Sequence, residues 1–561
     1  LKVLEKENMV GEYGFFEAID YTKFRLNDDE KNRVVKTYMA HHQGLILTSI
    51  NNVINNQILN ERFYMNPEIE STDILLQEKM PNSIMISRKS NEKLKKQKYI
   101  NEFYDKEVVY RNSDEANGIN VISSDDYTIL MDTEGKGYSK YKGFYIKRLK
   151  TNKIWSTMNY NDCRKYEIKF SSSKMQYTRE DEGIETEYKI IPMANFPAEI
   201  RRLTLKNYGL LEEKLEVTGV IEGVFSSLNQ DIAHPLFNNM FLYIDYLPEK
   251  DLFIGQRKDR NEENSRYWFG IKIYSNDRNI IGSTKFEIDK EKFIGRKNVK
   301  IPDMINNSYK LRSEIKDVSE PIIAINKQIV LESDSEINID FVICVSENRD
   351  ELIKRMQELE NEERRNTEFK LFKAKAEEEI KYLELNGDSI ENYQKMLSHI
   401  LNMDVKKKEK LLQRVYDKEY SINDLWKNGI SGDRPLFVAK INSIDNIEVI
   451  GELLKAFEFY RVKNIDIELC IINGEENSYE RILKGLIEQE IKKAQIEYLL
   501  NNQIFIIDEC NAEDIDLELI YAKADFYMDI KYGKLKLNIE ELEKKNLVLF
   551  NKRNKANDYK L

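Results

Sequence analysis

Apolar and polar side chains alternate with a period of two along much of the middle of the chain. Leu215, Val217 and Ile221 fall on one side of this pattern, and Glu216 and Glu222 fall on the other. Successive side chains of a β-strand point to opposite faces of a sheet, so this period is typical of strands with one buried face. Many such stretches, separated by glycine-containing turns, predict a large antiparallel β-sandwich.

The last part of the chain has a different pattern. Short apolar runs at 435–441, 465–472 and 503–508 alternate with amphipathic stretches at 446–462 and 478–500. Apolar residues three and four positions apart indicate helices in these stretches. Strands that alternate with helices form right-handed crossovers and a parallel sheet. The pattern therefore predicts a small α/β module.

Helical periodicity also marks two other regions. Between 32 and 56, the residues that fall near one helical face include Val35, His42 and Leu45, and this spacing predicts a helix. Residues 348–428 are charged, with sparse apolar positions. They predict a helical connector that packs on its neighbours, because no heptad pattern persists long enough for a coiled coil.

Composition excludes several classes of function. A chain of 561 residues indicates several domains, and its formal net charge of -11 argues against binding a nucleic-acid backbone, which needs a basic face.

The four cysteines are far apart and have no metal-ligand spacing, so ordinary thiols in a reducing compartment are expected. Neither a metal nor another cofactor is expected. No apolar run reaches about 18 residues, so no membrane span is expected in this chain.

A carboxylate among aromatic residues is the strongest candidate for catalysis. Glu17 lies close in sequence to Tyr13, Phe16 and Tyr21. Aromatic faces stack on sugar rings, and burial among them favours the protonated carboxyl group that glycoside chemistry uses as its acid. Asp20 follows three residues later and could share a helical face with Glu17. The alternative is a helix start whose aromatic residues are core and whose glutamate is solvated or caps the helix.

Two adjacent histidines, His41 and His42, form a second candidate. Neighbours on a helix point in directions about 100° apart, so these two do not easily bind one metal ion together. One histidine could hydrogen-bond a sugar hydroxyl or a catalytic carboxylate while the other supports the core, or both could be structural. Tyr38 and Gln43 flank the pair, and all four are candidate substrate-binding residues.

A third candidate lies in the predicted sandwich. Asp231 and His234 stand where a strand pattern gives way to a loop, and Arg257 and Trp268 lie on the next strands. Together they could form a carbohydrate cleft, with hydrogen bonds from the polar groups and stacking on the indole ring. A structural clamp at the end of a sheet is the favoured alternative, although all four residues are candidate substrate contacts.

Short motifs, in order along most of the chain, carry a resemblance to a known family. They lie at 11–22, 38–44, 75–81, 135–139, 231–237, 293–296 and 425–433. The first three resemble the closing part of the glucoamylase-like domain of cyclic β-1,2-glucan synthases. The sequence that follows resembles the sandwich domain associated with cellobiose and chitobiose phosphorylases.

This resemblance, with the periodicities above, implies a multidomain α+β fold. The expected parts are the closing helices of a partial α/α toroid at 1–85, a linker at 86–117, a carbohydrate-associated antiparallel β super-sandwich at 118–347, a helical linker at 348–430 and a small α/β module at 431–561.

The resemblance also implies a function. The chain would be a fragment of a cyclic β-1,2-glucan synthase-like enzyme and would contribute to glucan binding and to cyclisation by a retaining transglycosylation. Glu17 would be the nucleophile or the acid/base, its partner carboxylate would lie upstream, and the fragment alone would be inactive. Its partner would be a β-glucan, and it would be the soluble, cytoplasmic part of a membrane-embedded parent. Two alternatives stay open: a non-catalytic carbohydrate-binding or architectural segment, and a divergent glycoside phosphorylase.

Overall fold

The computed structural model contains two compact units, Leu1–Met85 and Ile86–Leu561. In the part of the chain that the structure describes, no helix is long and apolar enough to cross a membrane. The described residues are 2–22, 26, 31–64, 105–111, 118–125, 127–137, 141–158, 163, 165–226, 235–258, 266–275, 280–295, 301–307, 311, 313–401, 422–475 and 482–543.

The N-terminal unit combines helices with two small antiparallel ribbons, β1 with β2 and β3 with β4. Its elements are α1 (Lys2–Lys6), β1 (Val10–Gly11), β2 (Gly14–Phe15), β3 (Ala18–Asp20), β4 (Arg33–Val35), α2 (Ala40–Ile54) and α3 (Ile58–Tyr64).

The predicted helix over 32–56 is therefore wrong in its first part. Residues 33–35 form a strand, and the helix begins at Ala40. Val34 and Val35 are β-branched and favour a strand, where a stiff χ1 angle costs little. The segment around Glu17 is likewise extended and is not a helix start.

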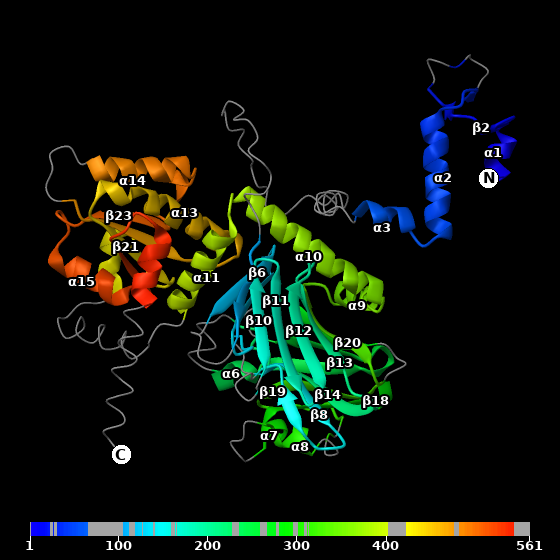
Figure 1. Cartoon of the computed structure of the whole chain (residues 1–561), viewed down its shortest axis with the longest axis horizontal. Coiled ribbons are helices and arrows are strands. Elements are labelled where there is room, and N and C mark those ends of the chain that lie inside the picture. The colour runs from blue at the N-terminus through cyan, green and yellow to red at the C-terminus, as the bar shows by residue number, and fades with distance from the viewer. Residues whose placement is uncertain are drawn as a thin grey trace. The chain divides into compact units, whose positions relative to one another are not determined.

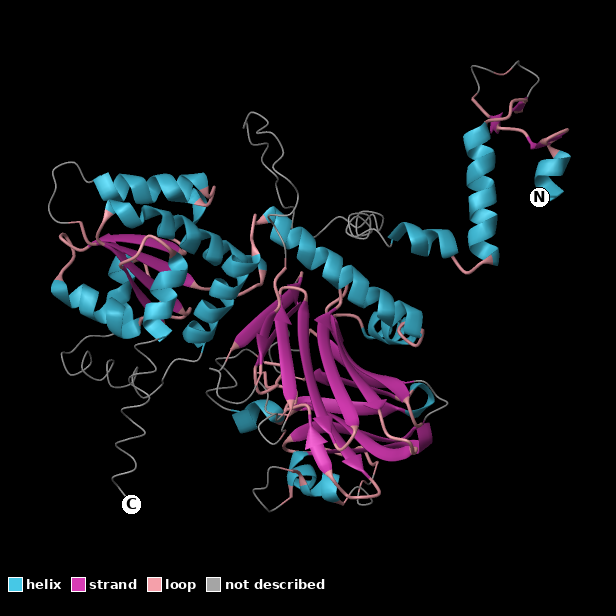
Figure 2. Ribbon diagram, in the orientation of Figure 1, coloured by secondary structure: helices cyan, strands magenta, loops and turns pink. Residues whose placement is uncertain are grey.

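Two large antiparallel sheets form the middle of the second unit (Figures 1 and 2). One has nine strands in the order β15-β16-β17-β20-β13-β12-β11-β10-β5, and the other has five in the order β18-β19-β14-β8-β9. The predicted super-sandwich is confirmed. The strands are β5 (Val108–Tyr110), β8 (Lys142–Arg148), β9 (Ile154–Ser156), β10 (Tyr166–Ser171), β11 (Lys174–Asp181), β12 (Ile184–Pro192), β13 (Ala198–Asn207), β14 (Glu213–Ile221), β15 (Leu242–Leu247), β16 (Leu252–Arg257), β17 (Trp268–Ser275), β18 (Ile280–Asp289), β19 (Pro321–Leu331) and β20 (Ser335–Ser346).

The alternating residues of the sequence pattern fill the space between the sheets. Leu215 and Val217 of β14 lie in the same core cluster as Phe341 of β20. Gly219 belongs to this packing, because a Cβ atom there would lie 2.9 Å from Cδ1 of Ile273. The edge strand β5, with Val109 at its centre, lies in the segment expected to be a linker, and three residues are too few to show a period of two.

Short helices and one extra hairpin complete the sandwich region. The hairpin pairs β6 (Ile119–Ser124) with β7 (Tyr127–Asp132). The helices are α6 (Pro235–Asn239), α7 (Lys290–Ile294) and α8 (Asp303–Asn306).

The charged helices after the sandwich pack closely on it, as the predicted connector requires. They are α9 (Arg349–Glu358), α10 (Glu362–Tyr382) and α11 (Gly387–Leu401). Leu352 and Met356 of α9 belong to the sandwich core. Arg365 of α10 donates to Oδ2 of the buried Asp340 in β20 at 2.6 Å.

The C-terminal module has a parallel four-stranded sheet in the order β23-β22-β21-β24, flanked by helices (Figure 2). The predicted α/β alternation is therefore confirmed. Its elements are β21 (Leu436–Ile441), α13 (Ile447–Val462), β22 (Glu468–Asn473), α14 (Ile482–Lys493), β23 (Ile504–Asp508), α15 (Asp514–Lys523) and β24 (Phe526–Ile530).

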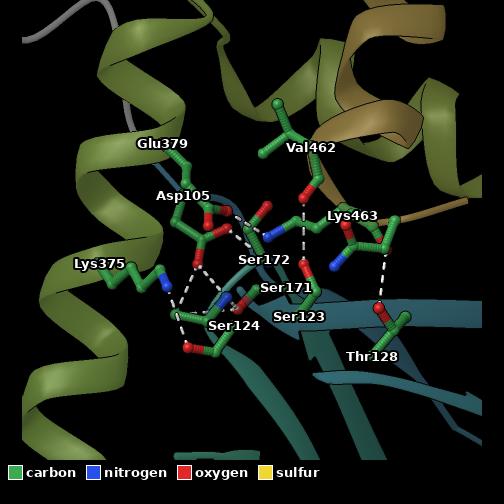
Figure 3. Close-up of polar contacts among 12 residues, drawn as sticks. Asp105, Ser123, Ser124, Thr128, Ser171, Ser172, Lys375, Glu379, Val462 and Lys463 are labelled. Atoms are coloured by element: carbon green, nitrogen blue, oxygen red, sulfur yellow. Dashed lines mark hydrogen bonds and ion pairs between the residues drawn. The ribbon is translucent and has the colours of Figure 1, made fainter. Parts of the chain in front are cut away.

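The hairpin β6–β7 joins the sandwich to this module (Figure 3). Thr128 Oγ1 donates to the carbonyl of Lys463 at 3.0 Å, and Ser123 Oγ donates to the carbonyl of Val462 at 3.4 Å. Val121 lies in the core cluster of the module, whereas its neighbour Ile122 lies in that of the sandwich. One strand therefore contributes to two cores.

A buried ion pair reinforces this junction and can be tested by mutation. The ammonium of Lys463, which is 1% exposed, pairs with Glu379 of α10. We expect Glu379→Gln to lower the free energy of unfolding by about 2 kcal/mol, because it removes the charge that compensates a buried ammonium. The exposed neighbour Glu378→Gln is the matched control in urea unfolding. Equal effects of the two substitutions would contradict a stabilising role for the pair.

Candidate functional site

Glu17 is held at one oxygen and buried at the other. Its Oε1 lies in direct contact with Nδ1 of His42, and the side chain of Glu17 is 10% exposed. Its Oε2 is buried and has no hydrogen-bond partner among the described residues. Buried polar atoms are normally satisfied, so an orphaned carboxylate oxygen is a feature that needs a functional or structural explanation.

Backbone pairing brings Glu17 and His42, which are 25 residues apart in sequence, close together. The Glu17 N–H donates to the carbonyl of Thr37 at 3.1 Å, next to the ribbon of β3 and β4. His42 lies in the first turn of α2, whose N-cap residue Met39 provides no side-chain cap. The carboxylate therefore lies beside the end of a helix that carries partial positive charge.

Aromatic rings line the same region. The ring of Tyr38 lies 5.3 Å from that of Phe16 and 5.7 Å from that of Tyr13, edge-on to the latter. The Tyr38 hydroxyl also accepts a hydrogen bond from the Tyr13 N–H at 3.3 Å. Gly11 makes this approach possible, because a Cβ atom there would lie 2.1 Å from the Tyr38 oxygen. The structure thus brings three predicted substrate-binding residues together.

Asp20 does not share a helical face with Glu17. Asp20 ends β3, and its Oδ1 accepts a hydrogen bond from the Thr22 N–H at 2.8 Å. A helix would have brought side chains three residues apart onto one face, but this segment is extended. That part of the sequence interpretation is wrong.

The remaining predicted residues of this unit are His41, Tyr21 and Gln43. The His41 ring lies 4.0 Å from that of His42, while Tyr21 is exposed and Gln43 is half-buried. Within the described ranges, no group of three His, Cys, Asp or Glu side chains is arranged to hold a metal ion.

The third sequence candidate is not assembled as a cleft. Asp231 and His234 lie outside the described residues. Trp268 pairs with Gln256, so Arg257 and Trp268 point to opposite faces of the sheet. Arg257 is buried and donates to the carbonyl and to Oδ1 of Asn238 at 3.2 and 3.0 Å. This contact is a clamp between α6 and β16.

Sequence reasoning missed a buried charge cluster at one end of the sandwich. Glu199 accepts hydrogen bonds from Arg201 at 2.9 Å and lies 2.7 Å from Nζ of Lys142. Burial raises the pKa of Glu199, but the charges of Arg201 and Lys142 outweigh it and lower the pKa to about 2. Tyr188 completes the cluster by accepting from Arg201 at 2.6 Å. Alternating charge on a strand is ordinarily a sign of a solvated face, so the pattern gave no signal of burial.

The fold and these sites define the class of domain. Residues 142–362 match the model of the glycosyl hydrolase 94 supersandwich domain. Residues 1–67 match the family described as "Putative glucoamylase". Two segments of the chain therefore match domain families named for carbohydrate-active enzymes.

A relative in the same class can be named. The chain is similar to the cyclic beta-(1,2)-glucan synthase NdvB of Rhizobium meliloti (strain 1021), with 22% identity over 523 residues. The match covers 88% of this chain and 18% of that protein, so the chain spans about a fifth of the relative's length. The resemblance drawn from the sequence motifs is confirmed.

Solved structures add similarities of low score. A bacterial glucoamylase complexed with acarbose has 10% identity and a TM-score of 0.29, covering 52% of this chain and 44% of its own. A polysaccharide lyase has 13% identity and a TM-score of 0.25, and the match covers 44% of this chain and 35% of the lyase chain. These scores carry no argument about function.

Proposed function

We propose that this chain is part of a cyclic β-1,2-glucan synthase-like enzyme and contributes a reacting carboxyl group, Glu17, to glucan transglycosylation. The observation that carries the proposal is the pair of unlike oxygens on Glu17. His42 contacts Oε1, and Oε2 is buried without a hydrogen-bond partner among the described residues, next in sequence to the aromatic ring of Phe16. Such an oxygen is available to a substrate atom, and the rings offer faces for sugar stacking.

Two roles for Glu17 fit this geometry. As a nucleophile, Oε2 would bond to the anomeric carbon while the bond to the leaving sugar oxygen breaks and that oxygen takes a proton from a second carboxyl group, giving a glycosyl-enzyme. A hydroxyl of the same glucan would then attack that carbon, return its proton to the second carboxylate, release Glu17 and close the ring. As the acid/base, a protonated Oε2 would give its proton to the leaving oxygen and later take one from the attacking hydroxyl. In both roles His42 is a positioning residue that fixes the carboxyl group through Oε1.

The proposed partner is a β-glucan, and the proposed parent is a longer, membrane-embedded protein with this part in the cytoplasm. The domain limits 1–85, 86–117, 118–347, 348–430 and 431–561 are proposed with it. Support comes from the glucan synthase relative and from the glucoamylase-type match over the residues that contain Glu17.

The direct test is incubation of residues 1–561 with linear β-1,2-glucan. We expect weak binding at most and no new oligosaccharides, because a retaining mechanism needs a second carboxyl group about 5–5.5 Å from the first. A longer protein that contains these residues should form cyclic products. Turnover by 1–561 alone would contradict an upstream partner and would make Asp20 the first partner to examine. A longer protein without transglycosylation would overturn the proposed function.

A second candidate function, an architectural one, is favoured by the junction in Figure 3. Buried polar contacts join the sandwich hairpin to the α/β module and to α10, so this unit can serve as a fixed platform. Binding of linear glucan without any turnover, in the chain and in the longer protein alike, would favour this function.

A further inference from the structure

A cavity of about 300 Å³ lies at one end of the sandwich, between the two sheets. Its walls come from β7, the start of β8, β13, the end of β20 and the segment 221–225 that follows β14. This volume is at the lower end of the range of small-molecule sites, about 300–1,000 Å³. The cavity can therefore take one small ring or the end of a longer chain.

An aromatic wall of the cavity is held under backbone strain. Phe225 has a φ of 45°, in the left-handed region that a bulky residue rarely adopts. Its ring stacks on that of Phe269 at 4.1 Å with an interplanar angle of 22°. Gly223 allows this arrangement, because a Cβ atom there would lie 2.1 Å from Cε2 of Phe225. Strain of this kind persists where the surroundings fix it and is concentrated at functional sites.

Charged groups of both signs line the other walls. Lys142, Arg201 and Glu222 all face the cavity. Lys142 and Arg201 bond to Glu199, and Glu222 pairs with Lys290. A lysine ammonium has three donors, so Lys142, whose side chain is a quarter exposed, can bond to a ligand as well as to Glu199.

This balance of charge selects the chemistry of a ligand. An anion would meet the Glu222 carboxylate, and the two cations on the wall are already bonded to a carboxylate. A neutral polyol can accept from an ammonium and donate to a carboxylate at the same time. An apolar ring face can lie against Phe225 and Tyr127, which lines the cavity from β7.

We propose that this cavity binds one neutral sugar ring, in addition to the site at Glu17. That the ligand is a neutral polyol with an apolar face is argued from the cavity alone. That the ring is a glucose unit of a β-glucan rests on the proposed function. Thr128, also on the wall, bonds to the carbonyl of Lys463, so the C-terminal module braces the hairpin side of the site.

Calorimetric titration of the 561-residue chain tests the proposal. The probes are glucose, the β-1,2-linked and β-1,4-linked glucose disaccharides, and inorganic phosphate. We expect a glucose disaccharide to bind and phosphate not to displace it. Val224→Phe should fill the cavity and weaken disaccharide binding at least tenfold. Val109→Phe, the same change on the exposed edge strand β5, should bind as the unmodified chain does.

Two further variants keep the result decisive. Tyr127→Phe removes one hydroxyl and little volume, so it serves if Val224→Phe does not fold, and it should weaken binding several-fold. Tyr13→Ala removes an aromatic face of the site near Glu17, so a disaccharide that still binds to this variant, and no longer binds to Val224→Phe, is bound in the cavity. Loss of binding in Tyr13→Ala with none in Val224→Phe would overturn the cavity and leave the proposed function standing. Absence of saccharide binding, or displacement of the bound saccharide by phosphate, would also overturn the cavity proposal. Tighter binding of the β-1,2-linked than of the β-1,4-linked disaccharide would extend the cavity proposal to the proposed substrate.

Discussion

Glu17→Gln is expected to reduce transglycosylation by several orders of magnitude in a longer protein that contains this chain and converts glucan. Glutamine keeps the shape of the side chain, but its amide can neither form a glycosyl-enzyme nor exchange a proton with a sugar oxygen. Removal of an interaction made with the reacting atoms lowers kcat while substrate binding persists. Product formation from linear β-1,2-glucan, measured together with glucan affinity, separates the two effects.

Glu12→Gln is the matched control for this substitution. Glu12 lies five residues before Glu17, but its side chain is exposed. The control should retain normal turnover, and His42→Gln should lower kcat less than Glu17→Gln because His42 only positions the carboxyl group. Near-normal turnover in Glu17→Gln would make Glu17 a structural residue and would remove the reason to place chemistry in this part of the chain.

The second large effect concerns the charge cluster at Glu199. Glu199→Leu should lower the free energy of unfolding of the second unit by about 3–5 kcal/mol, because it leaves the buried Arg201 guanidinium without its carboxylate. Urea unfolding followed by tryptophan fluorescence measures the change. Glu336→Leu is the control, since Glu336 is an exposed glutamate of β20 in the same sandwich, and it should change stability by about 0.5 kcal/mol or less.

The same cluster gives a pH dependence with a definite sign. The pKa of Glu199 is lowered from the ordinary 4.5 to about 2 in the folded protein. A lowered pKa in the folded state stabilises the protein above the ordinary value, and this stabilisation is lost as pH falls through the folded value. The difference in stability between the unmodified chain and Glu199→Leu should therefore shrink from pH 5 to pH 2. A difference that stays constant over this range would contradict the role of the ion pair.

Much of the fold was predictable because its signals are local. The strand predicted at 503–508 is β23 (Ile504–Asp508), and the helix predicted at 446–462 is α13 (Ile447–Val462). Each depends on a run of neighbouring side chains whose period fixes the type of element. The start of α2 was placed too early, because Val35 fits a helical face but pairs with Ala18 of β3 in a strand.

The sequence offered a contact between one histidine and a carboxylate, but it did not indicate which histidine makes the contact. Aromatic residues near Glu17 indicated carbohydrate chemistry, yet the pairing of Glu17 with His42 depends on a backbone contact to Thr37 that no local pattern encodes. Glu199 and Arg201 were missed for a related reason. Their polarity indicates solvent, and only the tertiary fold shows that they compensate each other in the interior.

The hairpin whose neighbouring residues Val121 and Ile122 belong to different cores has a consequence for cooperativity. Unfolding of the sandwich withdraws Val121 from the module, and unfolding of the module exposes a strand that the sandwich has ordered. The free energies of the two parts are therefore not independent, and a destabilising substitution in either should lower the melting temperature that is observed in the other. Heat should melt the sandwich and the module together in one transition.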